Sequence, residues 1–229
     1  YHILYKHRDH TEAESFIDHI IDYLNPSVSS KVLDLACGRG RHAVYLNKKG
    51  FDVVGLDLSD ESIAFANESS NASLSFEVKD MRQSFGENRF DYIFNLFTSF
   101  GYFDTDDENL LAIQQMAKAL KKDGLLLIDF MNTHLVEKGL IPVESKIADG
   151  IEFKINRIIR DDKIIKQISF EDNDQHFQFE ERVCALSLLD FERYADQAGL
   201  KIVSLFGGFE LEEFDIESSD RLILMAQRK

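Results

Sequence analysis

The chain has 229 residues, of which 44% are hydrophobic and 29% charged, and its 26 basic and 41 acidic residues give a formal net charge of -15. A chain of this length buries roughly 70% of its unfolded surface, which predicts one substantial globular domain. The negative charge repels a phosphate backbone and disfavours nucleic acid as a partner. We expect no membrane association, because no apolar run approaches the ~20 residues of a span and residues 1–10 lack a signal-peptide core. The two cysteines, Cys37 and Cys184, predict no disulfide framework and a cytoplasmic location.

Residues 12–130 alternate between helical and strand patterns. Apolar residues at helical intervals predict a helix over residues 12–24, and Ser59 and the capping box from Thr105 to Glu108 predict two further helix starts. Another helix is expected over residues 41–49. Aliphatic runs predict strands over residues 31–36, 51–57, 73–80, 90–97 and 124–130. This alternation is typical of a doubly wound α/β fold with a parallel sheet.

The pattern changes after Pro142. Strand-like runs are expected over residues 151–158, 163–170 and 176–183, and the third alternates Phe177, Phe179 and Val183 with polar residues. This alternation predicts an antiparallel sheet with one wet face. A helix over residues 187–198 and strands over residues 201–206 and 221–227 complete the chain. We therefore expect a Rossmann-like domain formed by residues 1–139 and 187–229, with an antiparallel β insertion at residues 140–186.

A glycine-containing turn follows the first strand. Gly38 and Gly40 allow the backbone to approach a ligand closely and to turn into a helix whose first N–H groups are unpaired. The spacing also fits a dinucleotide site, so the turn alone does not name the ligand. Asp34, before the turn, would repel a pyrophosphate but attract a ligand that carries an ammonium and a sulfonium. The structural alternative for Asp34 is a buried strand-end acid whose hydrogen bonds are satisfied.

Two further acids end strands. Asp57 closes the second strand, where a carboxylate can accept hydrogen bonds from both hydroxyls of a ribose; alternatively, it caps the helix that begins near Ser59. Asp80, followed by Met81, ends the third strand. The carboxyl ends of parallel strands meet at one edge of the sheet, so we expect these acids to lie near the glycine turn.

Five segments, DLACGRGRH, GLDLS, VKDM, FDYIFNLFTSFGYF and LKKDGLLLIDFMN, resemble in order and spacing the motifs of S-adenosylmethionine-dependent methyltransferases of the Rossmann-like class. The resemblance covers residues 31–132, resumes at the end of the chain and implies an antiparallel last strand. It implies S-adenosylmethionine as cofactor. It also implies that this cofactor is bound by Asp34, Cys37, Gly38, Gly40, Asp57, Leu58, Asp80, Met81, Asn95 and Leu96. Arg39 and Arg41 depart from the family pattern and add positive charge beside the cofactor carboxylate. In similar enzymes the N-terminal segment covers the cofactor, which makes Tyr5 and Arg8 candidate contacts; a frayed end is the alternative.

The acceptor side is less defined. The position of the insertion is similar to that in small-molecule N-methyltransferases, so we expect a small-molecule acceptor methylated at nitrogen rather than oxygen. We expect the insertion to act as a lid or to form a homodimer. Tyr102, Asp129 and His134 follow or end the fourth and fifth strands and are candidate bases. Phe94 and Phe97 are expected in the core, and Phe100, Tyr102 and Phe103 beside the site.

No metal site is expected, because the histidines lack cysteine or carboxylate neighbours at metal-ligand spacing. Two other functions remain compatible with the residues. One is a regulatory module that binds S-adenosylmethionine without catalysis, and the other is an NAD-dependent oxidoreductase.

Overall fold

The main sheet of the computed structural model, which describes residues 10–172 and 175–229, contains seven strands. Their order is β10-β11-β5-β4-β1-β2-β3, and β11 runs antiparallel to both of its neighbours. The sheet is therefore mainly parallel with an antiparallel last strand, as predicted. The strands are β1 (Lys31–Leu35), β2 (Asp52–Asp57), β3 (Leu74–Val78), β4 (Phe90–Asn95), β5 (Leu120–Met131), β10 (Leu200–Phe206) and β11 (Arg221–Arg228).

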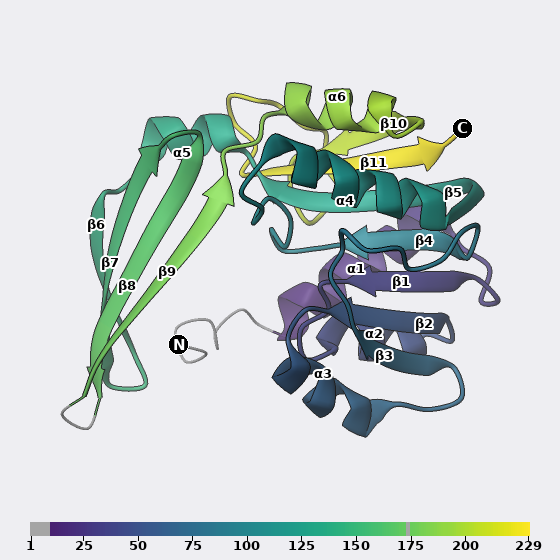
Figure 1. The fold of residues 1–229 in the computed structure, drawn as a ribbon, viewed down its shortest axis with the longest axis horizontal. Coiled ribbons are helices and arrows are strands. Elements are labelled where there is room, and N and C mark those ends of the chain that lie inside the picture. The colour runs from purple at the N-terminus through teal and green to yellow at the C-terminus, as the bar shows by residue number, and fades with distance from the viewer. Residues whose placement is uncertain (1–9, 173–174) are drawn as a thin grey trace.

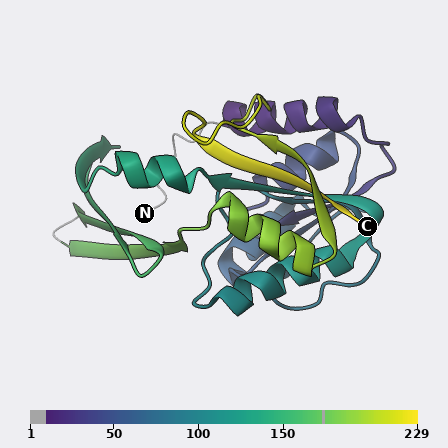
Figure 2. The same cartoon turned by 90° about the horizontal axis from the view of Figure 1, so that it is seen from above.

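Helices cover both faces of this sheet (Figures 1 and 2). On one face lie α1 (His10–Leu24), α2 (Arg41–Lys48) and α3 (Asp60–Ala66), which is followed by the short 3-10 helix η2 (Asn67–Ser69). Phe16, Ile17 and Ile20 of α1 are completely buried on this face. On the other face lie α4 (Asp106–Ala119) and α6 (Leu188–Gln197), whose buried residues include Met116 and Phe191. The doubly wound α/β architecture is confirmed.

Helix starts follow the predicted capping residues. The Ser59 side chain accepts the N–H of Ser62 at the start of α3. Thr105 and Glu108 form the capping box of α4, and Ser187 caps α6 in the same way with Asp190. These local contacts satisfy backbone donors that have no partner within the helix, which explains why short side-chain motifs predict the helix starts well.

A second, antiparallel sheet, which we call sheet B, lies beside the carboxyl edge of the main sheet (Figure 1). Its strands are β6 (Val143–Ala148), β7 (Ile151–Arg160), β8 (Lys163–Asp172) and β9 (Gln175–Cys184), in that order. Three of these strands were predicted. β6 and helix α5 (Thr133–Gly139) were missed, because β6 carries the charged residues Glu144 and Lys146 within a short run and α5 has one turn of apolar pattern.

Sheet B has one apolar face, as the alternation in residues 176–183 indicates. Phe153, Ile155, Ile168 and Phe170 are buried on it, and Phe177 packs against them. The end of β9 belongs to the core of the main sheet instead, where Val183, Cys184 and Leu186 pack with residues of α4 and α6. The main core therefore includes the last residues of the insertion expected at 140–186.

The two sheets are also joined by hydrogen bonds to the segment that follows β4. The Cys184 N–H donates to the Gly101 carbonyl at 2.7 Å, and Lys163 Nζ donates to the Phe103 carbonyl at 2.7 Å. Gly101 has φ +87, and a Cβ there would lie 3.2 Å from Val183 Cγ1. Sheet B is thus anchored on residues 101–103, next to Tyr102.

Candidate functional site

Two adjoining cavities lie at the carboxyl edge of the main sheet, with volumes of about 510 Å³ and about 750 Å³. Both are lined by Ala36, Phe97 and Ser99, so these residues mark the junction between the cavities. The sizes fall in the range of small-molecule and cofactor pockets. We call the smaller one the first cavity and the larger one the second cavity. Each is lined by residues that follow the ends of β1 and β4, where ligands of open α/β sheets bind.

The glycine turn between β1 and α2 has a left-handed backbone at Gly38, with φ +54, and at Gly40, with φ +80. A Cβ at Gly38 would meet no atom within 4 Å, which leaves open space beside the second cavity. A Cβ at Gly40 would lie 2.7 Å from the Phe76 ring of β3. Gly40 lines neither cavity, so its small size serves the turn and the packing of α2 on the sheet.

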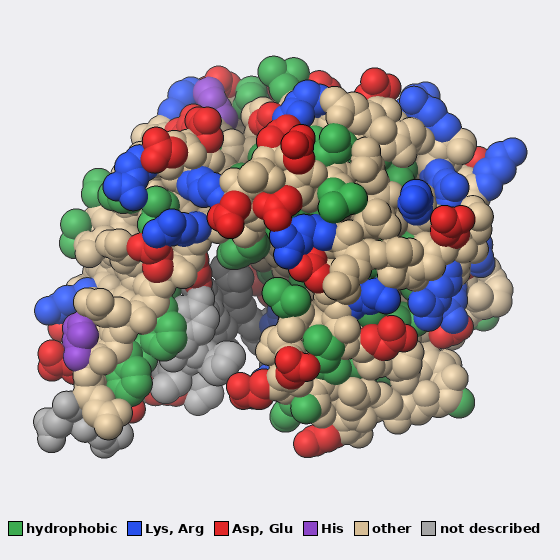
Figure 3. Space-filling model, viewed as in Figure 1, with side chains coloured by type: hydrophobic (Ala, Val, Ile, Leu, Met, Phe, Trp, Pro, Cys, Tyr) green, Lys and Arg blue, Asp and Glu red, His purple; other side chains and the backbone are tan. Residues whose placement is uncertain are grey.

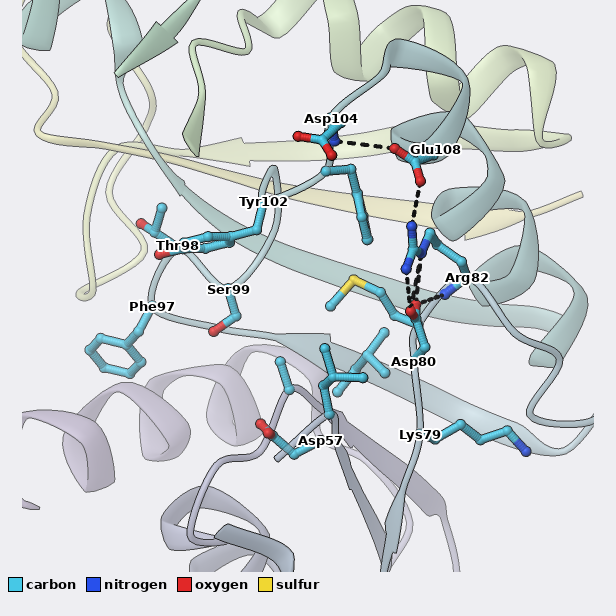
Figure 4. A pocket seen from close by; sticks show the side chains of 15 residues that line it. Asp57, Lys79, Asp80, Arg82, Phe97, Thr98, Ser99, Tyr102, Asp104 and Glu108 are labelled. Carbon is cyan, nitrogen blue, oxygen red and sulfur yellow. Dashed lines mark hydrogen bonds and ion pairs between the residues drawn. The ribbon is translucent and has the colours of Figure 1, made fainter. Parts of the chain in front are cut away.

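Asp57 joins the end of β2 to the glycine turn. Its Oδ2 accepts the Gly38 N–H at 2.8 Å, and its Oδ1 accepts the Ser59 N–H at 2.9 Å. Asp57 and Leu58 line the first cavity (Figure 4). A carboxylate has about four lone-pair sites, so these two bonds leave acceptor capacity for a ligand. Asp57 thus combines the expected position in the site with the structural role that was its alternative.

Asp34 is 2% exposed and lines the second cavity together with Cys37, Gly38 and Leu96. Its Oδ2 accepts the Ala43 N–H at 3.0 Å, which fastens the first turn of α2 to β1. Burial, together with the nearby Asp57 carboxylate, raises the pKa of Asp34 to about 7, against the opposing effects of the Ala43 N–H and Arg41. Asp34 is therefore a strand-end acid with one oxygen in a backbone hydrogen bond, and a cation in the second cavity would stabilise its ionised form.

Asp80 and Met81 line the first cavity, where Asp80 is held by an arginine two residues further on (Figure 4). Arg82 Nε donates to both oxygens of Asp80, at 3.0 Å and 3.1 Å, and Arg82 Nη1 donates to Glu108 in the first turn of α4. The hydrogen bonds from Arg82 lower the pKa of Asp80, so this carboxylate stays ionised. Arg82 also lies over the Phe103 ring, with 5.1 Å from Cζ to the centroid.

Asn95 was expected to complete the cofactor pocket, but it lines neither cavity. It is fully buried at the end of β4, and its Nδ2 donates to the Leu35 carbonyl at 2.9 Å. Its Oδ1 has no hydrogen-bond partner among the described residues. Asn95 thus ties β4 to the end of β1, one residue before the junction residue Ala36.

The three candidate bases lie in different places. Tyr102 is 52% exposed and lines the first cavity. Asp129 is 0% exposed, lines neither cavity, accepts the Phe97 N–H at 2.6 Å and pairs with Arg221. His134 also lines neither cavity and pairs with Glu217 at 3.0 Å. The structure therefore brings only Tyr102, of these three, to the cavities. Tyr5 and Arg8 lie outside the described residues.

Phe97, expected in the core, is partly buried against it and also lines both cavities, because β4 ends at Asn95 and the backbone then turns with φ 56 at Phe97. Its ring stacks on His42 with 5.1 Å between centroids and 1° between planes. Phe100, expected beside the site, is completely buried in the main core instead. Phe103 lines the first cavity, as expected.

Other lining residues were not among the predicted site residues. Arg82 comes directly after the predicted site residues Asp80 and Met81, and this position could have identified it as a site residue. Glu108 was interpreted only as a capping residue. His42 lines the second cavity, and burial together with Arg41 lowers its pKa to about 3, so it is a neutral imidazole. Arg39 and Arg41, the departures from the family pattern, also line the second cavity, as do Lys48 and Tyr45.

Within residues 10–172 and 175–229 no group of three or more His, Cys, Asp or Glu side chains could hold a metal ion. No described helix has both the length and the apolar character required to cross a membrane.

Comparison with known proteins agrees with this architecture. Residues 32–124 match the model of a methyltransferase domain. An N,N-dimethyltransferase of Streptomyces venezuelae that acts on dTDP-3-amino-3,4,6-trideoxy-alpha-D-glucopyranose is 24% identical, over 88% of this chain and 87% of that enzyme. An S-adenosylmethionine-dependent methyltransferase from Clostridium acetobutylicum has a similar fold, with a TM-score of 0.84, 20% identity and coverage of 98% of this chain and 94% of that chain. An amino pentose methyltransferase from Micromonospora echinaspora, solved with S-adenosylmethionine bound, has a TM-score of 0.75 at 18% identity, over 98% of this chain and 93% of that chain.

The cavities fit this cofactor on their own chemistry. Open space beside Gly38 admits a ligand, the acidic Asp34 attracts a cationic group in the second cavity, and Asp57 offers hydrogen-bond acceptors in the first. The methyltransferase domain matched at residues 32–124 and the sheet order with its antiparallel last strand are those of an S-adenosylmethionine-dependent methyltransferase of the Rossmann-like class.

Proposed function

We propose that this enzyme transfers the methyl group of S-adenosylmethionine to a nitrogen atom of a small-molecule amine. The observation that carries the proposal is the pair of adjoining cavities, each lined by acidic residues of its own, that meet at Ala36, Phe97 and Ser99. The cofactor has a nucleoside end and an amino-acid end joined by a sulfonium. Two joined compartments match a ligand of this shape.

The first cavity is the proposed nucleoside compartment. Asp57 would accept the ribose hydroxyls, because its carboxylate keeps acceptor capacity beyond its two backbone bonds. Asp80, Met81 and Leu58 would contact the adenine. The pairing with Arg82 keeps Asp80 an acceptor, which suits the donor hydrogens of the adenine amino group.

The second cavity is the proposed amino-acid compartment. Asp34 would attract the ammonium group, while Arg39 and Arg41 supply positive charge for the carboxylate. Gly38 and Cys37 would let the backbone approach the ligand, and Leu96 would contribute an apolar wall. Burial and the neighbouring acids raise the pKa of Cys37, so it remains a thiol and is not a nucleophile. The sulfonium would then lie at the junction residues.

When bound, the cofactor supplies an activated methyl group with a neutral thioether as leaving group. The residues of this chain therefore need to hold the acceptor in line with that methyl group and to exclude water. Tyr102 stands at the first cavity, where its hydroxyl can orient the acceptor and, once ionised to the phenolate, can accept a proton from an ammonium (Figure 4). Its neighbours in the chain, Gly101 and Phe103, carry the anchors of sheet B.

Sheet B is the proposed lid on the acceptor side. Val183 contacts the region of Gly101, and Glu181 lies two residues before it on the same apolar face. Glu181 lies 3.6 Å from Lys166, and burial raises its pKa. The Glu181–Lys166 pair places charged groups on this otherwise apolar face, and its carboxylate suits an amine better than a neutral hydroxyl. The similarity to an amino-sugar N,N-dimethyltransferase also supports nitrogen as the acceptor atom.

We also propose that the methyl acceptor is a small molecule and not a nucleic acid, that the enzyme is cytoplasmic and that it associates with a second copy of itself. On the face shown in Figure 3, basic side chains are interspersed with acidic ones, unlike the basic stripe of a nucleic-acid-binding protein. The two cysteines are unpaired and buried, which suits a reducing compartment. The homodimer through sheet B stays a prediction. Val143 and Ile147 of the edge strand β6 are 72% and 78% exposed and would be covered in such a dimer, and sedimentation velocity tests whether two copies associate.

The decisive experiment offers the protein S-adenosylmethionine labelled in the methyl group with a panel of primary and secondary amines, including amino sugars and glycine-like amines. Each amine is paired with the analogue in which a hydroxyl replaces the amino group. We expect label in the amines and none in the hydroxyl analogues. Label only in hydroxyl analogues would contradict nitrogen as acceptor. Binding of S-adenosylhomocysteine with no transfer to any member would favour a regulatory module that binds the cofactor.

A further inference from the structure

Two consecutive residues at the wall between the cavities have an unusual backbone. Phe97 and Thr98 follow β4 with φ 56 and 57, so two consecutive residues with side chains adopt the left-handed conformation. A β-branched residue such as Thr98 strongly disfavours this conformation, because its branched Cβ crowds the backbone. The conformation therefore persists only where the surrounding structure holds it.

The residues that hold this turn come from two other strands. Asp129 of β5 accepts the Phe97 N–H on Oδ2 at 2.6 Å and the Thr98 N–H on its backbone carbonyl at 3.0 Å. Arg221, the first residue of β11, donates from Nε to Asp129 Oδ1 at 2.8 Å and from Nη2 to Thr98 Oγ1 at 2.8 Å. One buried carboxylate and one guanidinium thus fix both residues of the turn.

The same turn forms the wall at which the cavities meet. Phe97 and Ser99 line both cavities, and Thr98 lines the first (Figure 4). Without these bonds, Phe97 and Thr98 would return to an extended or right-handed backbone and Phe97 would leave its stack on His42. The shape of the junction therefore depends on two residues that line neither cavity.

We propose that Asp129 and Arg221 are positioning residues that hold the turn at Phe97–Thr98 in its left-handed form and so shape the point where the sulfonium lies. This inference rests on the proposed placement of the cofactor across the two cavities. It assigns Asp129 a role other than that of a base, because its carboxylate already binds the Phe97 N–H and the Arg221 guanidinium.

Glycine at position 98 provides the test, because glycine adopts the left-handed conformation without steric cost. Arg221→Met removes the guanidinium and should weaken binding of S-adenosylhomocysteine, the probe ligand, by about tenfold or more in calorimetry, which corresponds to about 1.4 kcal/mol. Adding Thr98→Gly should restore most of that affinity. Thr98→Ala is the matched control, since it also removes the hydroxyl but keeps a Cβ, and it should not restore binding.

The outcomes separate the two proposals. If the parent protein does not bind S-adenosylhomocysteine, the proposed function fails. If the parent binds but Arg221→Met binds equally well, or if glycine and alanine at position 98 restore affinity equally or not at all, the positioning role is wrong. A purely structural role would lower the melting temperature and leave the dissociation constant well below that temperature unchanged. If Arg221→Met does not fold, Arg221→Lys replaces it, and glycine and alanine at position 98 are compared in that background. Lysine retains the charge but loses the forked donor geometry.

Discussion

The carboxylate of Asp57 accepts the backbone N–H of Gly38 at 2.8 Å, so the last residue of β2 holds the turn that follows β1. The parallel pairing of β1 and β2 brings these residues together. Asp57 therefore orders the glycine turn and at the same time presents acceptors to the first cavity. Because of this double role, we expect cofactor binding to be sensitive to substitution of Asp57.

Replacing Asp57 with alanine should weaken S-adenosylhomocysteine binding by about 2–3 kcal/mol, because charge-assisted hydrogen bonds are each worth about 1.5–3 kcal/mol. The fold should survive, since the residue stands at a strand end. Isothermal titration calorimetry measures the affinity. Asp60→Ala is the control, an exposed acid three residues further on that lines neither cavity. Equal affinity in Asp57→Ala and the parent would reject the assignment.

The raised pKa of Asp34 predicts how binding depends on pH. Its pKa is about 7 in the folded protein against 3.8 as the reference value, so ionisation of Asp34 destabilises the folded protein. This loss of folding stability grows as the pH rises between these two values and is constant above them. A bound ammonium group should stabilise the ionised form and release a proton from Asp34. Affinity for S-adenosylhomocysteine should therefore increase by about threefold to tenfold between about pH 6 and about pH 7.5.

Calorimetry in buffers of different ionisation enthalpy measures this proton release directly. Asp34→Asn is the control, because it keeps an oxygen for the Ala43 N–H but has no proton to release. The variant also corrects for titration of the amino group of the ligand. Proton release of equal size in the parent and in Asp34→Asn would show that Asp34 does not sense the ligand.

Arg82 should support the nucleoside compartment through its two acidic partners. Arg82→Gln removes the ion pairs to Asp80 and Glu108 and should weaken S-adenosylhomocysteine binding by about 1–2 kcal/mol, because the orientation of Asp80 is lost. Arg193→Gln is a matched control, since Arg193 also pairs with the first turn of α4, at Asp106, but lines neither cavity. Similar losses of affinity in both variants would mean that the effect comes from α4 stability alone.

Shortening sheet B should separate cofactor binding from methyl transfer. Replacing residues 143–181 with a short Gly/Ser linker leaves Val183, Cys184 and Leu186 in the main core and leaves every described cavity-lining residue of both cavities in place. We expect the shortened protein to bind S-adenosylhomocysteine like the parent and to lose transfer to an amine that the parent methylates. Turnover at the parent rate would exclude the lid.

Local sequence signals were sufficient for most of the fold. Strand and helix positions follow from short-range periodicity and from caps such as Ser59 and Thr105, whose partners lie within three residues. The parallel order also follows, because alternating strands and helices have few ways to pack. For the same reason, the positions of Asp34, Asp57 and Asp80 at or just after the ends of predicted strands suffice to predict that these three acids lie at one edge of the sheet.

Only the tertiary structure decided what those acids contact. The Asp57 carboxylate meets Gly38 across a strand pair, and Arg221 reaches Asp129 and Thr98 over sequence separations of 92 and 123 residues. No periodicity encodes such contacts, because they depend on how distant strands are ordered in the sheet. The same long-range contacts made Phe97, which was expected only to pack in the core, a wall of both cavities as well. They also made Asp129, a candidate base from its position in the sequence, a support of that wall.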